Sequence, residues 1–129
     1  CSVINCSTPY YNLGARKLAD WLRSEGRTVA YSDGDPGLFG GLADHVYLSV
    51  IFSWHATLAV EIYHRYKLNS EIECGGPGMF ALGKWWKQQT STECHAGLDG
   101  RFDKQRGNYR MTFASRGCPV GCFFCIVPN

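Results

Sequence analysis

The sequence predicts an α/β protein, a Rossmann-like parallel sheet with flanking helices. Within residues 1–89, short segments rich in apolar and β-branched residues alternate with longer segments whose apolar residues recur every three to four positions. Turn residues, mainly glycine and proline, stand at the ends of the short segments. Strands and helices that alternate in this way form parallel sheets with helical crossovers.

The first strand–helix–strand unit is expected within residues 2–31. Ser2–Asn5 is the first strand, and Thr28–Tyr31 is the second. The apolar residues of the helix between them fall on one face: Tyr11, Ala15, Leu18 and Leu22. Gly26 supplies a stop for this helix. Ser32–Gly41 carries four glycines and one proline, which predicts a loop.

The second unit repeats the alternation. Val46–Phe52 is an almost continuous apolar run, which is typical of a strand buried on both faces of a parallel sheet. A helix over His55–Tyr66, a strand over Glu71–Cys74 and a helix over Met79–Gln88 follow. Gly75–Gly78 is either a tight turn or an anion-binding loop at a helix start. It does not match G-x-G-x-x-G, so a nicotinamide site is not supported.

Composition describes an ordinary globular protein, with 45% hydrophobic and 19% charged residues in a chain of 129. The net charge of +2 gives no electrostatic reason to expect nucleic acid or a membrane as a partner. No apolar run reaches the roughly 18 residues of a membrane-spanning helix. The seven cysteines are an odd number without a disulfide pattern, so we expect metal binding and a reducing, cytoplasmic compartment.

The most informative motif lies near the carboxyl end, where Cys118, Cys122 and Cys125 form a C-x3-C-x2-C spacing. Thiolates this close can bind one soft metal centre, such as an iron–sulfur cluster, zinc or copper(I). A [4Fe–4S] cluster needs four cysteines to be closed, so three leave one iron open for a substrate or cofactor. Gly117 and Gly121 allow the tight backbone turns that a short loop needs around a cluster.

This motif resembles the signature of radical S-adenosylmethionine (radical SAM) enzymes, in which an aromatic residue precedes the last cysteine, here Phe124. The resemblance implies a [4Fe–4S] cluster on Cys118, Cys122 and Cys125 whose open iron chelates S-adenosylmethionine. It also implies reductive cleavage of that cofactor to a 5′-deoxyadenosyl radical, with Phe124 near the adenine. An electron donor such as a flavodoxin or ferredoxin is implied as a partner. The substrate is not specified.

The resemblance also suggests a division of the chain. Arg116-Gly117 and Cys118-Pro119 look like the variant in which a Rossmann-like, often cobalamin-binding, domain precedes the catalytic barrel. We therefore expect a Rossmann-like domain over 1–89, a linker over 90–108, and the truncated start of a radical SAM (β/α) barrel over 109–129. The chain is expected to be a fragment at both ends. Cobalamin is a further candidate cofactor, although no Asp-x-His-x-x-Gly motif supports it.

Two alternatives stay open. The same three cysteines, completed by Cys94 or His95, would make a zinc site in a non-catalytic interaction module. The three cysteines further up the chain, Cys6, Cys74 and Cys94, suggest the additional cluster of methylthiotransferases. The cysteine that this cluster requires after the third strand is missing, because Phe52-Ser53-Trp54 stands there. Buried free cysteines are the simpler interpretation.

Overall fold

Four parallel strands form one sheet in the part of the chain that the computed structural model describes, residues 1–37 and 42–95. The strand order is β2-β1-β3-β4, and every neighbouring pair is parallel. The strands are β1 (Ser2–Asn5), β2 (Ala30–Asp33), β3 (His45–Ser49) and β4 (Glu71–Gly75). The predicted α/β class with a parallel sheet is confirmed.

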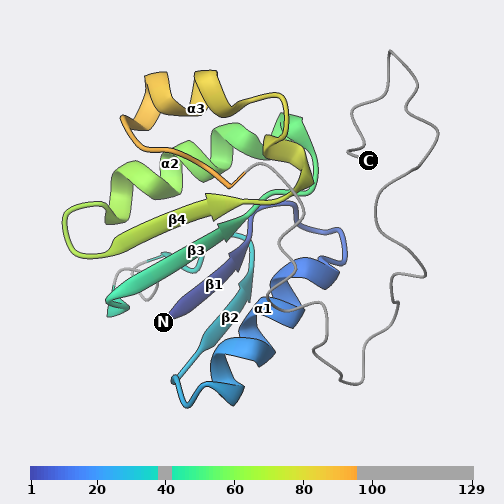
Figure 1. Cartoon of the computed structure of the whole chain (residues 1–129), viewed down its shortest axis with the longest axis vertical. Helices are drawn as coiled ribbons and strands as arrows, with labels where there is room; N and C mark the ends of the chain where they lie inside the picture. The colour runs from blue at the N-terminus through green and yellow to red at the C-terminus, as the bar shows by residue number, and fades with distance from the viewer. Residues whose placement is uncertain (38–41, 96–129) are drawn as a thin grey trace.

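Helices cover the two faces of the sheet unequally. Helix α1 packs on β1 and β2 on one face, while α2 and α3 lie together on the other (Figure 1). The three helices are α1 (Leu13–Ser24), α2 (Ala56–Tyr66) and α3 (Gly83–Thr90). Two short 3-10 turns, η2 (Ser53–His55) and η3 (Pro77–Met79), precede α2 and α3. The chain therefore forms a three-layer sandwich with one layer only partly filled.

The alternation of side chains along β1 builds both halves of the core. Val3 packs with the apolar face of α1, and the next residue, Ile4, packs with the cluster under α2 and α3. Both residues have no exposed surface, because β1 lies inside the sheet with helices on both sides. Trp86 of α3 is also buried and packs edge-to-face on Tyr63 of α2. Burial of such apolar surface is the main stabilising contribution.

The prediction that Val46–Phe52 is a strand buried on both faces is wrong in two respects. The strand is His45–Ser49, because the amide of Val50 makes a last hydrogen bond to Gly75 of β4 and the amides of Ile51 and Phe52 then donate to Ser7 Oγ in the loop after β1. Along the strand only Val46 and Leu48 are buried, while His45, Tyr47 and Ser49 on the other face are partly exposed. The reason is that α1 packs on β1 and β2, so it covers the same face of β3 only in part.

Other boundaries shift by a few residues. The strand predicted at Thr28–Tyr31 is Ala30–Asp33, because pairing with β1 begins at Ser2 opposite Ala30. The carbonyl of Thr28 instead accepts from the amino-terminal ammonium group at 2.9 Å. The helix predicted at Met79–Gln88 begins only at Gly83, since the 3-10 turn η3 takes up the residues before it.

The chain returns to the sheet after α3. Ser91 adopts a left-handed conformation that ends the helix, and Thr92 Oγ1 accepts a hydrogen bond from Trp86 Nε1. The amide of His95 then donates to the carbonyl of Cys74 at 2.8 Å, and His95 pairs with Gly75 in an isolated parallel bridge. Residues 92–95, which were predicted to belong to a linker, thus lie beside β4. Most of the predicted linker and all of 109–129 fall outside the described residues.

None of the helices in residues 1–37 and 42–95 combines the length and the apolar character needed to cross a membrane.

Replacing Gly76 by alanine should strongly destabilise the fold. Gly76 has φ +111°, and an added Cβ would lie 2.4 Å from the carbonyl oxygen of Val50. Left-handed strain and steric overlap together should lower the free energy of unfolding by about 2–4 kcal/mol, as measured by urea denaturation. Gly83→Ala is the matched control, because an added Cβ there meets nothing within 4 Å. It should be neutral or stabilising by up to about 1 kcal/mol, and equal effects at the two positions would contradict the prediction.

Candidate functional site at the carboxyl ends of the strands

The candidate site is the edge of the sheet where the parallel strands end. In open α/β sheets, ligands bind at the carboxyl ends of the strands where the strand order reverses direction. Here that point lies between β1 and β3. From β1 the chain passes through α1 to β2 on one side, whereas β3 and β4 are added on the other side. The loops 6–12 and 50–55 leave the sheet at this point, and the loop 76–82 leaves from β4 beside them.

Asn5 is the polar centre of this edge. It is fully buried at the end of β1, and its side-chain amide makes four hydrogen bonds. Nδ2 donates to the carbonyl of Tyr10 and to Oδ1 of Asp33, each at 2.9 Å. Oδ1 accepts from the amide of Ser7 and from Asn12 Nδ2, each at 3.0 Å. Both donors and both lone pairs of the amide are therefore satisfied.

Asn12 and Ser7 extend this network to the neighbouring elements. Asn12 Oδ1 accepts from the amide of Ala15 and so caps α1, while its Nδ2 also donates to Ser49 Oγ at the end of β3. Ser7 Oγ accepts from the amide of Ile51 at 2.9 Å. These hydrogen bonds join the ends of β1 and β3 to the loop that leads to α1 and to the loop that leads to α2.

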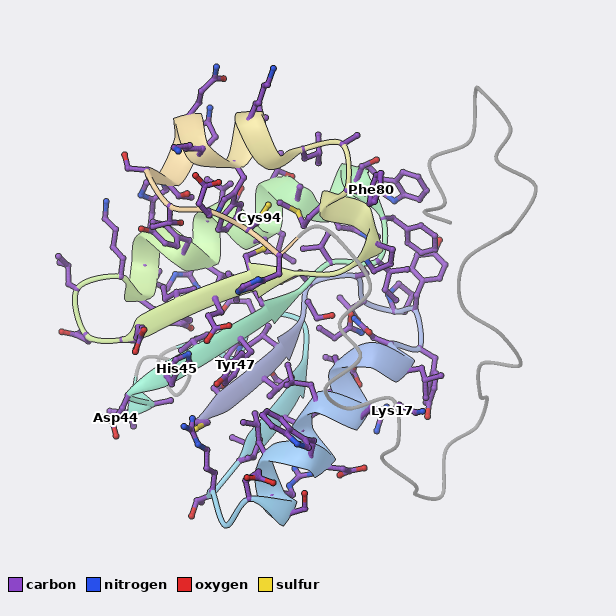
Figure 2. The ribbon with its side chains drawn as sticks, in the orientation of Figure 1. Lys17, Asp44, His45, Tyr47, Phe80 and Cys94 are labelled. Carbon is purple, nitrogen blue, oxygen red and sulfur yellow. The ribbon has the colours of Figure 1, made fainter. Side chains whose placement is uncertain are left out.

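Aromatic side chains cover the solvent side of this edge. We call Tyr10, Phe52, Trp54 and His55 the aromatic group. Phe52 stacks on Trp54 with ring centroids 4.7 Å apart, and Tyr10 meets Phe52 edge-to-face at 4.9 Å. Trp54 is 65% exposed and Tyr10 is 49% exposed. Phe80, also partly exposed, lies at the same end of the molecule (Figure 2). Exposed rings of this kind can pack against an apolar or planar ligand.

Arg16 occupies the flank of the site beside β2. Its guanidinium lies over the rings of both Tyr11 and Tyr31, at 5.0 and 4.7 Å from the ring centroids. It also pairs with Asp33 at 3.4 Å. Burial raises the pKa of Tyr31, and the hydrogen bond that its hydroxyl donates to Asp33 raises it further. The carboxylate of Asp33 is therefore already occupied by Asn5, Tyr31 and Arg16.

The glycine-rich turn after β4 packs against the chain instead of facing a ligand. The amide of Gly78 donates to the carbonyl of Val50, and the amide of Met79 donates to the carbonyl of Gly76, each at 3.0 Å. A Cβ on Gly78 would lie 2.7 Å from the backbone of Phe52. Of the two interpretations of Gly75–Gly78, the structure supports the tight turn, because these amides already have partners.

The cysteines within the described residues are free thiols. Burial raises the pKa of Cys6 to about 12 and raises the pKa of Cys74 well above its ordinary value. Burial also raises the pKa of the more exposed Cys94. Metal ligation requires the thiolate form. Across residues 1–37 and 42–95, no group of three His, Cys, Asp or Glu side chains is arranged to hold a metal ion. Cys6 and Cys74 are thus buried free thiols, and Cys94 is a partly buried one.

The predicted cluster ligands Cys118, Cys122 and Cys125, and the predicted cofactor contact Phe124, lie outside the described residues. The two candidate fourth ligands of the zinc alternative are described. Cys94 packs on the core beneath α3, and His95 is exposed with Nε2 at 3.3 Å from Glu73 Oε2 (Figure 2 labels Cys94).

Sequence reasoning missed the Asn5 network and the aromatic group. One signal was readable in advance, since an asparagine immediately before a periodic apolar segment, here Asn12, is a typical helix cap. The other members come from separate loops that only the folded sheet brings together.

Replacing Asn5 by alanine should disrupt this edge. The change leaves the buried amide of Ser7 and one of the two side-chain N–H groups of Asn12 without an acceptor. Each buried group without a partner costs about 1–3 kcal/mol. We expect the free energy of unfolding to fall by about 3 kcal/mol or more in urea denaturation. Asn69→Ala is the matched control, because Asn69 is exposed after α2, and it should change stability by less than about 0.5 kcal/mol. A neutral Asn5→Ala variant would contradict the assignment of Asn5 as the organising residue.

In comparisons with known proteins, no family model, curated protein or solved structure matches this chain. Its function must therefore be inferred from its own residues.

Proposed function

We propose that this protein is a radical SAM enzyme, in which Cys118, Cys122 and Cys125 hold a [4Fe–4S] cluster. The observation that carries the proposal is the C-x3-C-x2-C spacing with Phe124 before the last cysteine. When bound, the cluster supplies the electron that cleaves S-adenosylmethionine to a 5′-deoxyadenosyl radical. The three cysteines leave one iron without a protein ligand, and this open iron is where the cofactor binds. By the resemblance to radical SAM enzymes, Phe124 would be the residue beside the adenine.

The described part of the chain supports this ligand assignment by elimination. A cluster needs thiolates, and the thiols of Cys6 and Cys74 are buried in apolar surroundings that raise their pKa. Residues 1–37 and 42–95 hold no competing group of metal ligands. The cysteines that remain for a cluster are thus those of the carboxyl-terminal motif and the partly buried Cys1 and Cys94.

The proposed architecture is a Rossmann-like domain followed by a radical SAM (β/α) barrel that begins at the cysteine segment. The parallel sheet supplies the first part, and ligands of such sheets bind at the carboxyl ends of the strands. The partner is an electron donor such as a flavodoxin or ferredoxin, and the compartment is the cytoplasm. For cobalamin, the chain offers no cobalt-binding histidine in the loop after β1, since residues 6–12 contain no histidine.

Zinc binding by the same three cysteines is the second candidate, and one observation favours it. Histidines that bind metals commonly hydrogen-bond a carboxylate through their other ring nitrogen. His95 Nε2 lies 3.3 Å from Glu73 Oε2, so its Nδ1 could serve as a fourth ligand. Cys94 is the weaker choice, because burial raises its pKa.

Anaerobic reconstitution of the full chain with iron and sulfide tests the proposal. We expect about four irons per chain and a broad absorbance near 400 nm, which are typical of a [4Fe–4S] cluster. Cys122→Ala removes one of three ligands and should abolish cluster assembly. Cys6→Ala is the control, since this buried thiol takes no part, and it should leave iron content and absorbance unchanged.

Three results would overturn the assignment. A fully assembled cluster in Cys122→Ala would show that Cys122 is not a ligand. Loss of the cluster in Cys6→Ala would revive the second cluster of the methylthiotransferases. Stoichiometric zinc that is retained by the purified chain and lost in His95→Ala would favour the zinc module.

A further inference from the structure

Cys74 and Cys94 lie side by side on neighbouring segments of the sheet. His95 pairs with Gly75 in a parallel bridge, and its amide donates to the carbonyl of Cys74 at 2.8 Å. The residues one position earlier, Cys94 and Cys74, are therefore laterally adjacent. Both contribute to the same apolar cluster beneath α2 and α3. Side chains of laterally adjacent residues on parallel segments point to the same face.

The backbone spacing at this point suits a disulfide. Disulfides need Cβ atoms about 3.5–4.5 Å apart. At the bridge itself, a Cβ built on Gly75 would lie 3.3 Å from the Cβ of His95. This value belongs to the neighbouring pair and is slightly shorter than the disulfide range, and it shows that the two backbones are in close contact one residue from the two thiols. Cys94 is partly exposed, so a reagent can reach it, while Cys74 is only 2% exposed.

The sheet order places the other thiols near the amino terminus farther from Cys74 along the sheet. Cys6 follows β1, which is separated from β4 by β3. Two strand spacings amount to about 9–10 Å, which is beyond the roughly 7 Å between Cα atoms that a disulfide tolerates. Cys1 precedes β1 and so lies at the opposite end of the parallel strands. Cys6 contributes to the same apolar cluster as Cys74 and Cys94 and interacts electrostatically with Cys74. Within the described residues, Cys94 is the cysteine on the segment that pairs directly with the end of β4.

We propose that Cys74 and Cys94 form an oxidation site that a low-molecular-weight disulfide, such as oxidised glutathione, converts into an intramolecular disulfide. The proposal is independent of the cluster at the carboxyl-terminal cysteines. Its consequence for the fold is that residues 92–95 become covalently fixed to β4 at the point where the chain leaves the sheet.

The reaction balances as two thiol–disulfide exchanges. The Cys94 thiolate attacks one sulfur of oxidised glutathione, which forms a mixed disulfide and releases one glutathione thiolate. The Cys74 thiolate then attacks Sγ of Cys94 and releases the second glutathione thiolate. Two protein thiols lose two protons and two electrons, and one glutathione disulfide becomes two glutathione thiols.

The environment of both thiols sets the pH dependence of this reaction. Burial raises the pKa of Cys94 and of Cys74, so both are protonated near neutral pH. The thiolate fraction rises as pH approaches the pKa from below. The exchange is therefore run at mildly alkaline pH, where a larger fraction of each thiol is ionised.

Peptide mapping of the full chain tests the pairing, because trypsin separates the relevant thiols. Cys74 falls in residues 68–84, Cys94 in 88–101, Cys1 and Cys6 in 1–16, and the three motif cysteines in 117–129. The protein, free of iron, is incubated with oxidised glutathione, remaining thiols are blocked with N-ethylmaleimide, and the digest is analysed by mass spectrometry. We expect 68–84 joined to 88–101, two hydrogens lighter than the separate peptides.

Two variants sharpen the result. Cys94→Ser should abolish the linked species and leave 68–84 alkylated at Cys74. Cys6→Ala should give the same linked species as the unaltered protein. Complete alkylation of both peptides after prolonged oxidation would overturn the proposal, and so would Cys74 or Cys94 joined mainly to 1–16 or to 117–129.

Discussion

The geometry of the carboxyl edge depends on one buried amide, that of Asn5. A buried polar group is stable only when its hydrogen-bonding capacity is used, and Asn5 uses all of its own through Ser7, Tyr10, Asn12 and Asp33. Each partner belongs to a different feature: the turn after β1, the start of the aromatic group, the cap of α1 and the end of β2. No partner can move without leaving a buried donor or acceptor unpaired, so the positions of these features are coupled.

The partly filled helical layer explains why one face of β3 and β4 is polar. Because α1 packs on β1 and β2, the same face of β3 and β4 carries polar side chains. His45 Nε2 lies 2.9 Å from Glu73 and its Nδ1 lies 3.3 Å from Glu71, while His95 contacts the other oxygen of Glu73. The opposite face, beneath α2 and α3, is apolar. The sequence pattern of β4 reflects this, with glutamates alternating with Ile72 and Cys74.

The class of the fold was predictable because it depends on the local periodicity of apolar residues. The ends of the strands were not predictable, since they depend on which residues of other strands pair with them. Thr28 and Val29 have strand-forming side chains, yet the ladder starts at Ala30, opposite Ser2. The apolar run of β3 continues beyond Ser49, but the amides of Ile51 and Phe52 donate to Ser7 Oγ in the loop after β1. The C-x3-C-x2-C motif could be recognised because its thiols are close in sequence. The Asn5 network could not, since Asn5 and Asp33 meet only when β1 pairs with β2.

The cysteines of this chain differ in how much free energy it costs to convert the thiol into a thiolate. Cys6 and Cys74 are enclosed by apolar side chains, where the uncharged thiol is favoured and sulfur behaves as a small hydrophobic group. A cluster ligand must be a thiolate and needs a positive metal centre beside it to compensate for the loss of hydration. Three closely spaced cysteines can meet around such a centre without help from the sheet. The cysteines of the sheet lack that compensation, so oxidation to a neutral disulfide is the chemistry that suits their surroundings.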